Sequence, residues 1–223
     1  KKKANLLHGY GAHHHWRLEE RLKNGLVMEI NYPEDETIRK VTRRITVAED
    51  TCRVDFLDEI EIQKDGELPL GLHPIFKLSD REGMTELEVP SCQGIRTYPF
   101  PTDETSIFMP DQWVSDIRKV PLKKGGTVDA SMLPLVQHTE ELLLLCNVKR
   151  PEVILHNKEE DYRVKLTWDG ELLKHCLLWM SNRGCKAHPW NGDTLCLGVE
   201  PITAAFDLGS VISRGENPLR KEG

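Results

Sequence analysis

The fold class is decided by Ile38-Arg-Lys-Val-Thr-Arg-Arg-Ile-Thr-Val47 and by Thr51-Cys-Arg-Val-Asp-Phe-Leu-Asp-Glu-Ile-Glu-Ile62. In the second stretch apolar and polar residues alternate with a period of two and one slip, and the first does much the same, which is typical of a β-strand with one buried face. The intervening Glu49-Asp50 suits a tight turn. The sequence therefore predicts that the two stretches pair as an antiparallel hairpin.

Similar short apolar or alternating runs recur along the rest of the chain, separated by Tyr-Pro, Asp-Gly, Asn-Gly and Gly-Gly breakers. They predict strands at Leu26–Asn31, Thr85–Val89, Leu142–Asn147, Glu152–His156, Arg163–Trp168, Leu177–Ser181 and Thr194–Val199. Many strands with scarcely any helical periodicity predict an all-β fold, mostly antiparallel, built as a large sandwich or barrel. The proline-rich region Pro99–Gly126 is expected to be a long ordered connection.

Length, charge and cysteine usage narrow the class of protein. A chain of 223 residues suits one large β domain, so we expect a single domain over 1–223. The net charge is -6 and the only basic run is Lys1 to Lys3, so a nucleic-acid partner is not expected. No apolar stretch reaches the roughly 18 residues of a transmembrane helix, so no membrane partner is expected. Six cysteines without CxxC spacing favour a reducing cytoplasm.

His73 lies in an unusual segment, Leu70-Gly-Leu-His-Pro-Ile-Phe76. A histidine before a proline is restricted to extended geometry, and the apolar neighbours, Phe76 among them, would form a wall beside it. A functional histidine is one interpretation of this pattern. A partly buried structural histidine is the other.

Glu200 ends the otherwise apolar run Leu195-Cys-Leu-Gly-Val-Glu200. A buried carboxylate is costly unless it has a partner or a raised pKa, and both situations recur at active sites. Glu200 is therefore a candidate general base. The alternative is a structural ion pair with a nearby arginine such as Arg183.

Aromatic residues beside polar, glycine-containing segments suggest a sugar ligand. Trp16, Trp179 and Trp190 adjoin segments such as Ser181-Asn182-Arg183-Gly184 and Asn191-Gly192. Sugar C–H faces stack on aromatic rings, while sugar hydroxyl groups need polar partners. For some of these tryptophans a place in the core is the alternative interpretation.

A metal centre is not expected from the sequence. Adjacent strand residues point to opposite faces, so His13, His14 and His15 cannot all face one ion. No His, Asp and Glu cluster has ligand spacing elsewhere, and GxSxG, P-loop and GxGxxG motifs are absent.

Taken together, the ordered motifs resemble the aldose 1-epimerase (galactose mutarotase-like) family. The resemblance rests on five segments: His8-Gly9 to Trp16, Gly71-Leu-His-Pro-Ile-Phe76, Leu178-Trp-Met-Ser-Asn-Arg-Gly184, Pro189-Trp-Asn-Gly192 and Leu197-Gly-Val-Glu-Pro201. They follow the family's order and span most of the chain.

This resemblance implies a β-supersandwich and cofactor-independent interconversion of the α and β anomers of an aldose. By the same resemblance, Glu200 matches the family's general base, His73 its general acid and His8 a sugar contact. Trp16, Phe76, Trp179, Asn182, Arg183 and Trp190 are the further substrate-binding candidates. The implied partner is a small sugar.

Two departures from the family pattern limit this interpretation. Family members are longer, so we expect terminal strands to be missing from this sequence, and the family's sugar-binding Arg and Asp have no clear counterpart. A non-catalytic carbohydrate-binding protein of the same fold stays open as an alternative. So does a glycoside hydrolase or lyase, although a hydrolase generally needs two carboxylates and only one stands out.

Overall fold

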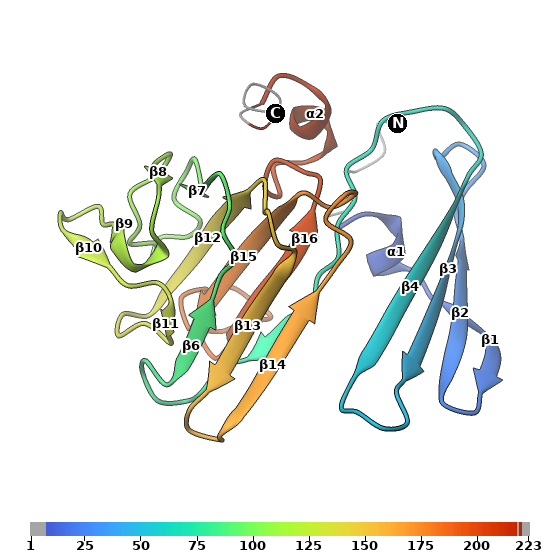
Figure 1. The fold of residues 1–223 in the computed structure, drawn as a ribbon. Coiled ribbons are helices and arrows are strands. Elements are labelled where there is room, and N and C mark those ends of the chain that lie inside the picture. The colour runs from blue at the N-terminus through green and yellow to red at the C-terminus, as the bar shows by residue number, and fades with distance from the viewer. Residues whose placement is uncertain (1–7, 218, 220–223) are drawn as a thin grey trace. The chain divides into compact units, whose positions relative to one another are not determined.

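The computed structural model describes residues 8–217 and residue 219, so the lysine run Lys1 to Lys3 lies outside the described part. The chain divides into two compact units with their boundary between Leu68 and Pro69. The regular structure of each unit consists mainly of antiparallel strands (Figure 1). The expected all-β class is therefore confirmed.

The first unit contains a short helix and one four-stranded antiparallel sheet in the order β1-β2-β3-β4. Its elements are α1 (Tyr10–His13), β1 (Arg17–Leu22), β2 (Gly25–Asn31), β3 (Ile38–Val47) and β4 (Val54–Ile62). The predicted hairpin is confirmed as β3 and β4, with Thr46 opposite Asp55. A small core of Ile30, Ile38 and Val41 packs on one face of this sheet.

The second unit contains a six-stranded sheet in the order β5-β16-β15-β12-β7-β8 and a four-stranded sheet in the order β11-β6-β13-β14. The strands of the first are β5 (Ile75–Lys77), β7 (Gly94–Thr97), β8 (Trp113–Val114), β12 (Thr139–Cys146), β15 (His175–Asn182) and β16 (Leu195–Ile202). The strands of the second are β6 (Thr85–Glu88), β11 (Met132–Leu133), β13 (Glu152–Asn157) and β14 (Tyr162–Thr167). A small β9–β10 pair (Val120–Pro121, Thr127–Val128), η1 (Ile117–Lys119) and α2 (Ser210–Arg214) complete the unit.

The main core of the second unit lies between its two larger sheets. Leu87, Val153 and Leu155 from the four-stranded sheet join Leu143 and other residues of the six-stranded sheet in one cluster. Figure 1 shows β6, β13 and β14 in front of β12, β15 and β16. Burial of apolar side chains between two such sheets is the main stabilising contribution in a β-sandwich.

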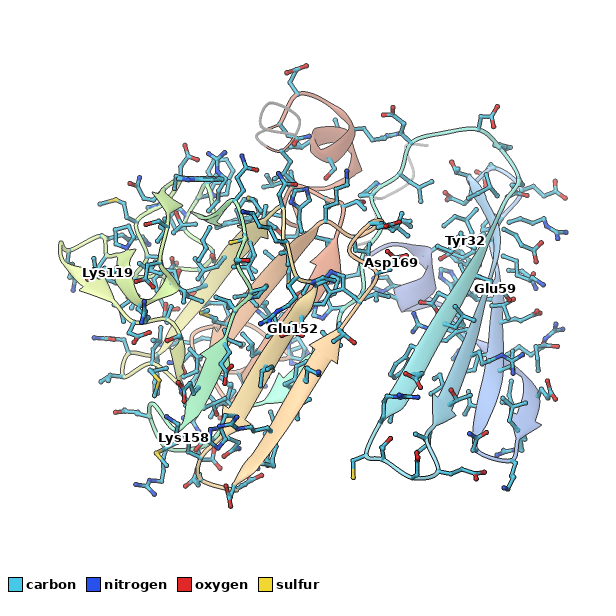
Figure 2. The ribbon with its side chains drawn as sticks, viewed as in Figure 1. Tyr32, Glu59, Lys119, Glu152, Lys158 and Asp169 are labelled. Atoms are coloured by element: carbon cyan, nitrogen blue, oxygen red, sulfur yellow. The ribbon has the colours of Figure 1, made fainter. Side chains whose placement is uncertain are left out.

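All seven further strands predicted from the sequence are present, with boundaries that differ by no more than a few residues. The region Pro99–Gly126 is a long connection, as expected, but it also contains β8, η1 and β9. Lys119 marks the end of η1 in Figure 2, and Glu152 and Lys158 lie at the beginning and just beyond the end of β13. No helix in the described part of the chain is long and apolar enough to span a membrane.

Candidate functional site

The two faces of the six-stranded sheet have different environments. Along β12 and β15, residues such as Leu143 and Leu178 point into the main core. The alternate residues Leu142, Leu144 and Leu177 form a second apolar cluster on the opposite face. We call this opposite face, away from the four-stranded sheet, the outer face. It is where the candidate site lies.

Glu200 lies on the outer face of β16. It is opposite Leu177 in the register of β15 and β16, and its neighbours Val199 and Leu197 point into the main core. Only 6% of Glu200 is exposed. Because side chains alternate between the two faces of a strand, the Glu200 carboxyl group lies on the outer face, beside the second apolar cluster.

His73 is held beside Glu200 by an extended segment that runs along the side of β16 away from β15. Gly71 forms a bridge with Ile202, and Ile75 in β5 pairs with Gly198. Antiparallel counting between these two pairs places His73 opposite Glu200. The backbone N–H of Leu72 donates to the Pro201 carbonyl at 3.0 Å, and the N–H of Val199 donates to the Pro74 carbonyl at 3.0 Å.

His73 and Glu200 form a close pair, with Nε2 of His73 3.4 Å from Oε1 of Glu200. The His73 side chain keeps 30% of its surface exposed, whereas that of Glu200 keeps 8%. Gly198 makes room for the pair, since a Cβ there would lie 2.8 Å from Oε1 of Glu200 and 3.2 Å from Cβ of Trp179. A buried carboxyl group next to a more accessible imidazole is an arrangement suited to proton exchange.

The environment of Glu200 favours its protonated form. Burial raises the pKa of this carboxyl group to about 8, and the nearby Asp207 carboxylate adds to the rise. A positively charged His73 at 3.4 Å would oppose the rise, because it stabilises the ionised carboxylate. The two groups thus lie at a distance at which a proton can pass between them.

Trp179 also packs against His73. The two rings meet edge-to-face, with centroids 5.8 Å apart and an interplanar angle of 77°. The indole Nε1–H of Trp179 donates a 2.6 Å hydrogen bond to Oε1 of Glu140. Glu140 also lies on the outer face and is 5% exposed. Its other oxygen, Oε2, accepts from the Ser181 hydroxyl at 3.1 Å and from the Cys185 backbone N–H at 3.3 Å.

Polar groups also lie next to the second apolar cluster at β7, on the side of β12 away from β15. Arg96 in β7 is opposite Leu144, which is opposite Leu177, so Arg96 shares a cross-strand row with Glu200. The Arg96 guanidinium pairs with Asp111 at 3.1 Å. Tyr98 follows β7 and packs edge-to-face on Phe206 at 5.3 Å. Burial and the Asp207 carboxylate raise the pKa of the Tyr98 hydroxyl.

The structure brings together three of the sequence candidates, Glu200, His73 and Trp179. It places two others on the opposite face of the same sheet. Phe76 is opposite Leu197 and packs against the main core. Asn182 is buried, and its amide donates to the backbone carbonyls of Leu135 and Gln137.

Arg183 and Trp190 lie beyond the end of β15. The Arg183 guanidinium pairs with Asp80 at 3.2 Å, so the ion pair considered between Arg183 and Glu200 is replaced by one with Asp80. Trp190 is 38% exposed in the turn segment between β15 and β16.

His8 and Trp16 belong to the first unit. His8 is exposed and adopts a left-handed backbone conformation with φ of 61°. Trp16 donates its indole N–H to the Gly11 carbonyl at 2.9 Å, and the Arg43 guanidinium lies 5.2 Å from the centre of its ring. The sugar contacts expected of these two residues stay predictions.

Glu140 was missed in the sequence. It belongs to Thr139-Glu140-Glu141, which precedes the apolar run Leu142–Leu145 and reads as a polar strand end. Alternation with Leu142 and Leu144 could have placed Glu140 on the outer face. The described residues contain no group of three or more His, Cys, Asp and Glu side chains arranged to hold a metal ion.

Comparison with known proteins gives one informative match. No family model matches the sequence, and no curated protein matches it. Among solved structures, the chain is similar to a putative aldose 1-epimerase from Escherichia coli K12, with a TM-score of 0.56 and 12% sequence identity. The match covers 86% of this chain and 58% of that one. At this identity the match shows the fold, so the expected sandwich fold of the aldose 1-epimerases is confirmed.

Proposed function

We propose that the chain acts on a small sugar as a cofactor-independent isomerase that interconverts the α and β anomers of an aldose. The observation that carries the proposal is the His73–Glu200 pair, 3.4 Å apart on the outer face of the sheet beside Trp179. The fold shared with a putative aldose 1-epimerase supports it.

The proposed chemistry needs one base and one acid. The Glu200 carboxylate removes the proton from the C1 hydroxyl group while the His73 imidazolium donates a proton to the ring oxygen. The bond between C1 and the ring oxygen breaks as the C1 carbonyl forms. After rotation about C1–C2, the proton transfers reverse and the ring closes on the other face. Each positioned acid or base typically contributes about 10²–10⁴-fold to the rate.

The active form of the pair is the one in which Glu200 has lost its proton and His73 carries one. It has the same number of protons as the form with neutral Glu200 and neutral His73. The raised pKa of Glu200 makes the form with two neutral groups more favourable than it would be for an exposed carboxyl group. We therefore expect a bell-shaped dependence of the rate on pH, with its maximum where the pair holds one proton.

The second carboxylate on the outer face, Glu140, does not favour glycoside hydrolysis. Glu200 is opposite Leu177 and Glu140 is opposite Ser181, so their Cα atoms are roughly 16 Å apart by strand geometry. Both oxygens of Glu140 also accept hydrogen bonds from the protein. A hydrolase needs its second carboxyl group free to act on the sugar or on a water molecule.

The test is an NMR exchange screen over aldoses and their 6-phosphates, comparing the wild-type chain with Glu200→Gln and His73→Gln. We expect wild type to accelerate anomer exchange for at least one sugar, and each variant to lose most of that acceleration. Sugar binding with no accelerated exchange would instead favour the non-catalytic carbohydrate-binding alternative. If Glu200→Gln kept full exchange activity, the assignment of Glu200 would be wrong.

A further inference from the structure

The second buried carboxylate of the outer face has no part in the proton transfers described above. Glu140 lies at the start of β12, opposite Ser181 of β15. Glu200 is opposite Leu177, four residues away from Ser181 on the same strand. Burial raises its pKa, against the hydrogen bonds from Trp179, Ser181 and Cys185. Removing a carboxylate from water is costly, so a buried one on this face calls for an account of its role.

We propose that Glu140 is a positioning residue that orients His73 by fixing the indole ring of Trp179. This inference rests on the proposed function, since it gives Glu140 a role in the same proton transfer. It extends that function to a residue that touches neither the sugar nor the acid–base pair.

Three contacts link Glu140 to the acid–base pair. The carboxylate of Glu140 accepts from the Trp179 Nε1–H at 2.6 Å. The Trp179 ring meets the His73 ring edge-to-face at 5.8 Å. The His73 Nε2 lies 3.4 Å from Oε1 of Glu200.

The orientation of Glu140 is itself fixed by neighbouring groups. Its Oε2 accepts from the hydroxyl of Ser181 and from the backbone N–H of Cys185. Oε1 is thus left for Trp179, and rotation of the carboxylate would break other bonds. A ring held at its N–H and packed at its opposite end against neighbouring groups keeps one orientation. An imidazole displaced by about 1 Å can cost roughly 10²-fold in rate.

Glu140→Gln cannot reproduce this arrangement. If the amide oxygen accepts from Trp179, the amide N–H₂ faces the N–H of Cys185 and leaves that donor without a partner. If the amide is turned round, Trp179 loses its acceptor. Either way one buried donor is unsatisfied, which weakens the hold on the indole ring.

Glu141 provides a matched control on the same strand. It is also a buried glutamate, but it points to the opposite face of the sheet. Its Oε2 accepts from the Ser106 hydroxyl at 3.0 Å, and its Oε1 accepts from the Phe108 N–H at 3.2 Å. Thr139 donates to its Oε1 at 2.5 Å. In Glu141→Gln the amide oxygen can keep these Oε1 donors, because the Ser106 hydroxyl can turn to accept from the amide N–H₂.

The experiment combines NMR of the full chain with anomer-exchange kinetics for wild type, Glu140→Gln, Trp179→Phe, the double variant and Glu141→Gln. We expect Glu140→Gln to shift the Trp179 indole N–H and the His73 imidazole resonances, and to lower kcat roughly 10-fold with KM within a factor of about three. The double variant should be no slower than Trp179→Phe, because Glu140 acts through Trp179. Glu141→Gln should leave the two resonances in place.

Two outcomes would overturn the inference, and both differ from failure of the proposed function. Unchanged His73 resonances in Glu140→Gln would remove the link, whatever the activity. Additive rate losses in the double variant would show that Glu140 acts by another route. If wild type exchanged no anomers, the proposed function would fail, whereas the resonance shifts would still decide whether Glu140 orients His73.

Discussion

At the scale of single residues, Glu200 combines two properties that bear on its proposed chemistry. It is a carboxyl group with 6% of its surface exposed, and it lies on a sheet face whose neighbouring histidine keeps contact with solvent. Burial favours the neutral carboxyl group, whereas the chemistry proposed for it requires the ionised one. The pH therefore controls both the stability of the chain and its proposed activity.

The first prediction concerns stability. Because the pKa of Glu200 is raised to about 8 from 4.5, its contribution to stability is fully present below pH 4.5 and is lost as the pH rises towards 8. Relative to Glu200→Gln, which stays neutral, wild type should lose stability on the order of a few kcal/mol between pH 5 and pH 9. Urea denaturation of both proteins at these two pH values measures the difference, and a pH-independent difference would contradict the raised pKa.

The second prediction concerns Asp207, whose carboxylate raises the pKa of Glu200 and the pKa of Tyr98. In Asp207→Asn a negative charge near the pair is removed, so each proton is released more easily. Both limbs of the pH–rate profile should move to lower pH. Glu160→Gln is the control, because Glu160 pairs with Lys77 and should leave the profile unchanged. Unchanged limbs in Asp207→Asn would rule out electrostatic coupling to the pair.

At the scale of elements, β16 positions the site by alternating its side chains between the core and the outer face. Among the residues of β16 that lie on the outer face, Gly198 is the one without a side chain. It lies between the carboxyl group of Glu200 and the ring of Trp179. The close approach of these two groups requires a residue without Cβ.

The third prediction is that Gly198→Ala impairs activity more than folding. The added Cβ would lie 2.8 Å from Oε1 of Glu200, so the carboxyl group must move away from His73. We expect kcat to fall at least about 10-fold. Gly170→Ala is a matched control, since its Cβ would meet Pro151 at 2.9 Å in a turn. Anomer-exchange kinetics and thermal unfolding of both variants separate the two effects, and equal kcat values would contradict the prediction.

The long strands could be predicted from the sequence because their pattern is local. The apolar run in Leu142–Cys146 is set by burial of both sheet faces, and in Ile38–Val47 the apolar residues Ile38 and Val41 are the buried ones. Of the short strands, β6 could be predicted from its sequence, whereas β7 and β11 could not. Their strand conformation depends on pairing with β12 and β6, partners far away in the sequence.

The candidate site could be predicted in part for the same reason. Glu200 stands out as a charge at the end of an apolar run, and His73 stands out before a proline. Which face a side chain points to requires the strand boundaries. Phe76 follows Ile75 directly, so it lies on the face opposite Ile75. Asn182 is an odd number of residues from Trp179, so it lies on the face opposite Trp179. The hydrogen bond from Trp179 to Glu140 joins distant segments and leaves no local signal.

At the scale of the whole molecule, the proposed acid–base pair and its supports belong to one unit. His73, Glu200, Trp179 and Glu140 all lie in the second unit, after Leu68. Three of them are carried by β12, β15 and β16, whose buried side chains fill the main core on one face and the second apolar cluster on the other. The side chains of the site thus start from strands whose residues are almost all buried.

The fourth prediction tests this protection by hydrogen exchange. All eight residues of β12 are buried, and the strand is paired on both sides, with β15 and with β7. In β1, an edge strand of the first unit, five of six residues are exposed. Backbone amides of β12 should therefore exchange only through large-scale opening, whereas those of β1 should exchange through local fraying. Exchange followed by mass spectrometry should find β12 and β15 the slowest segments, and equal rates in β1 and β12 would contradict a site built on the stable core.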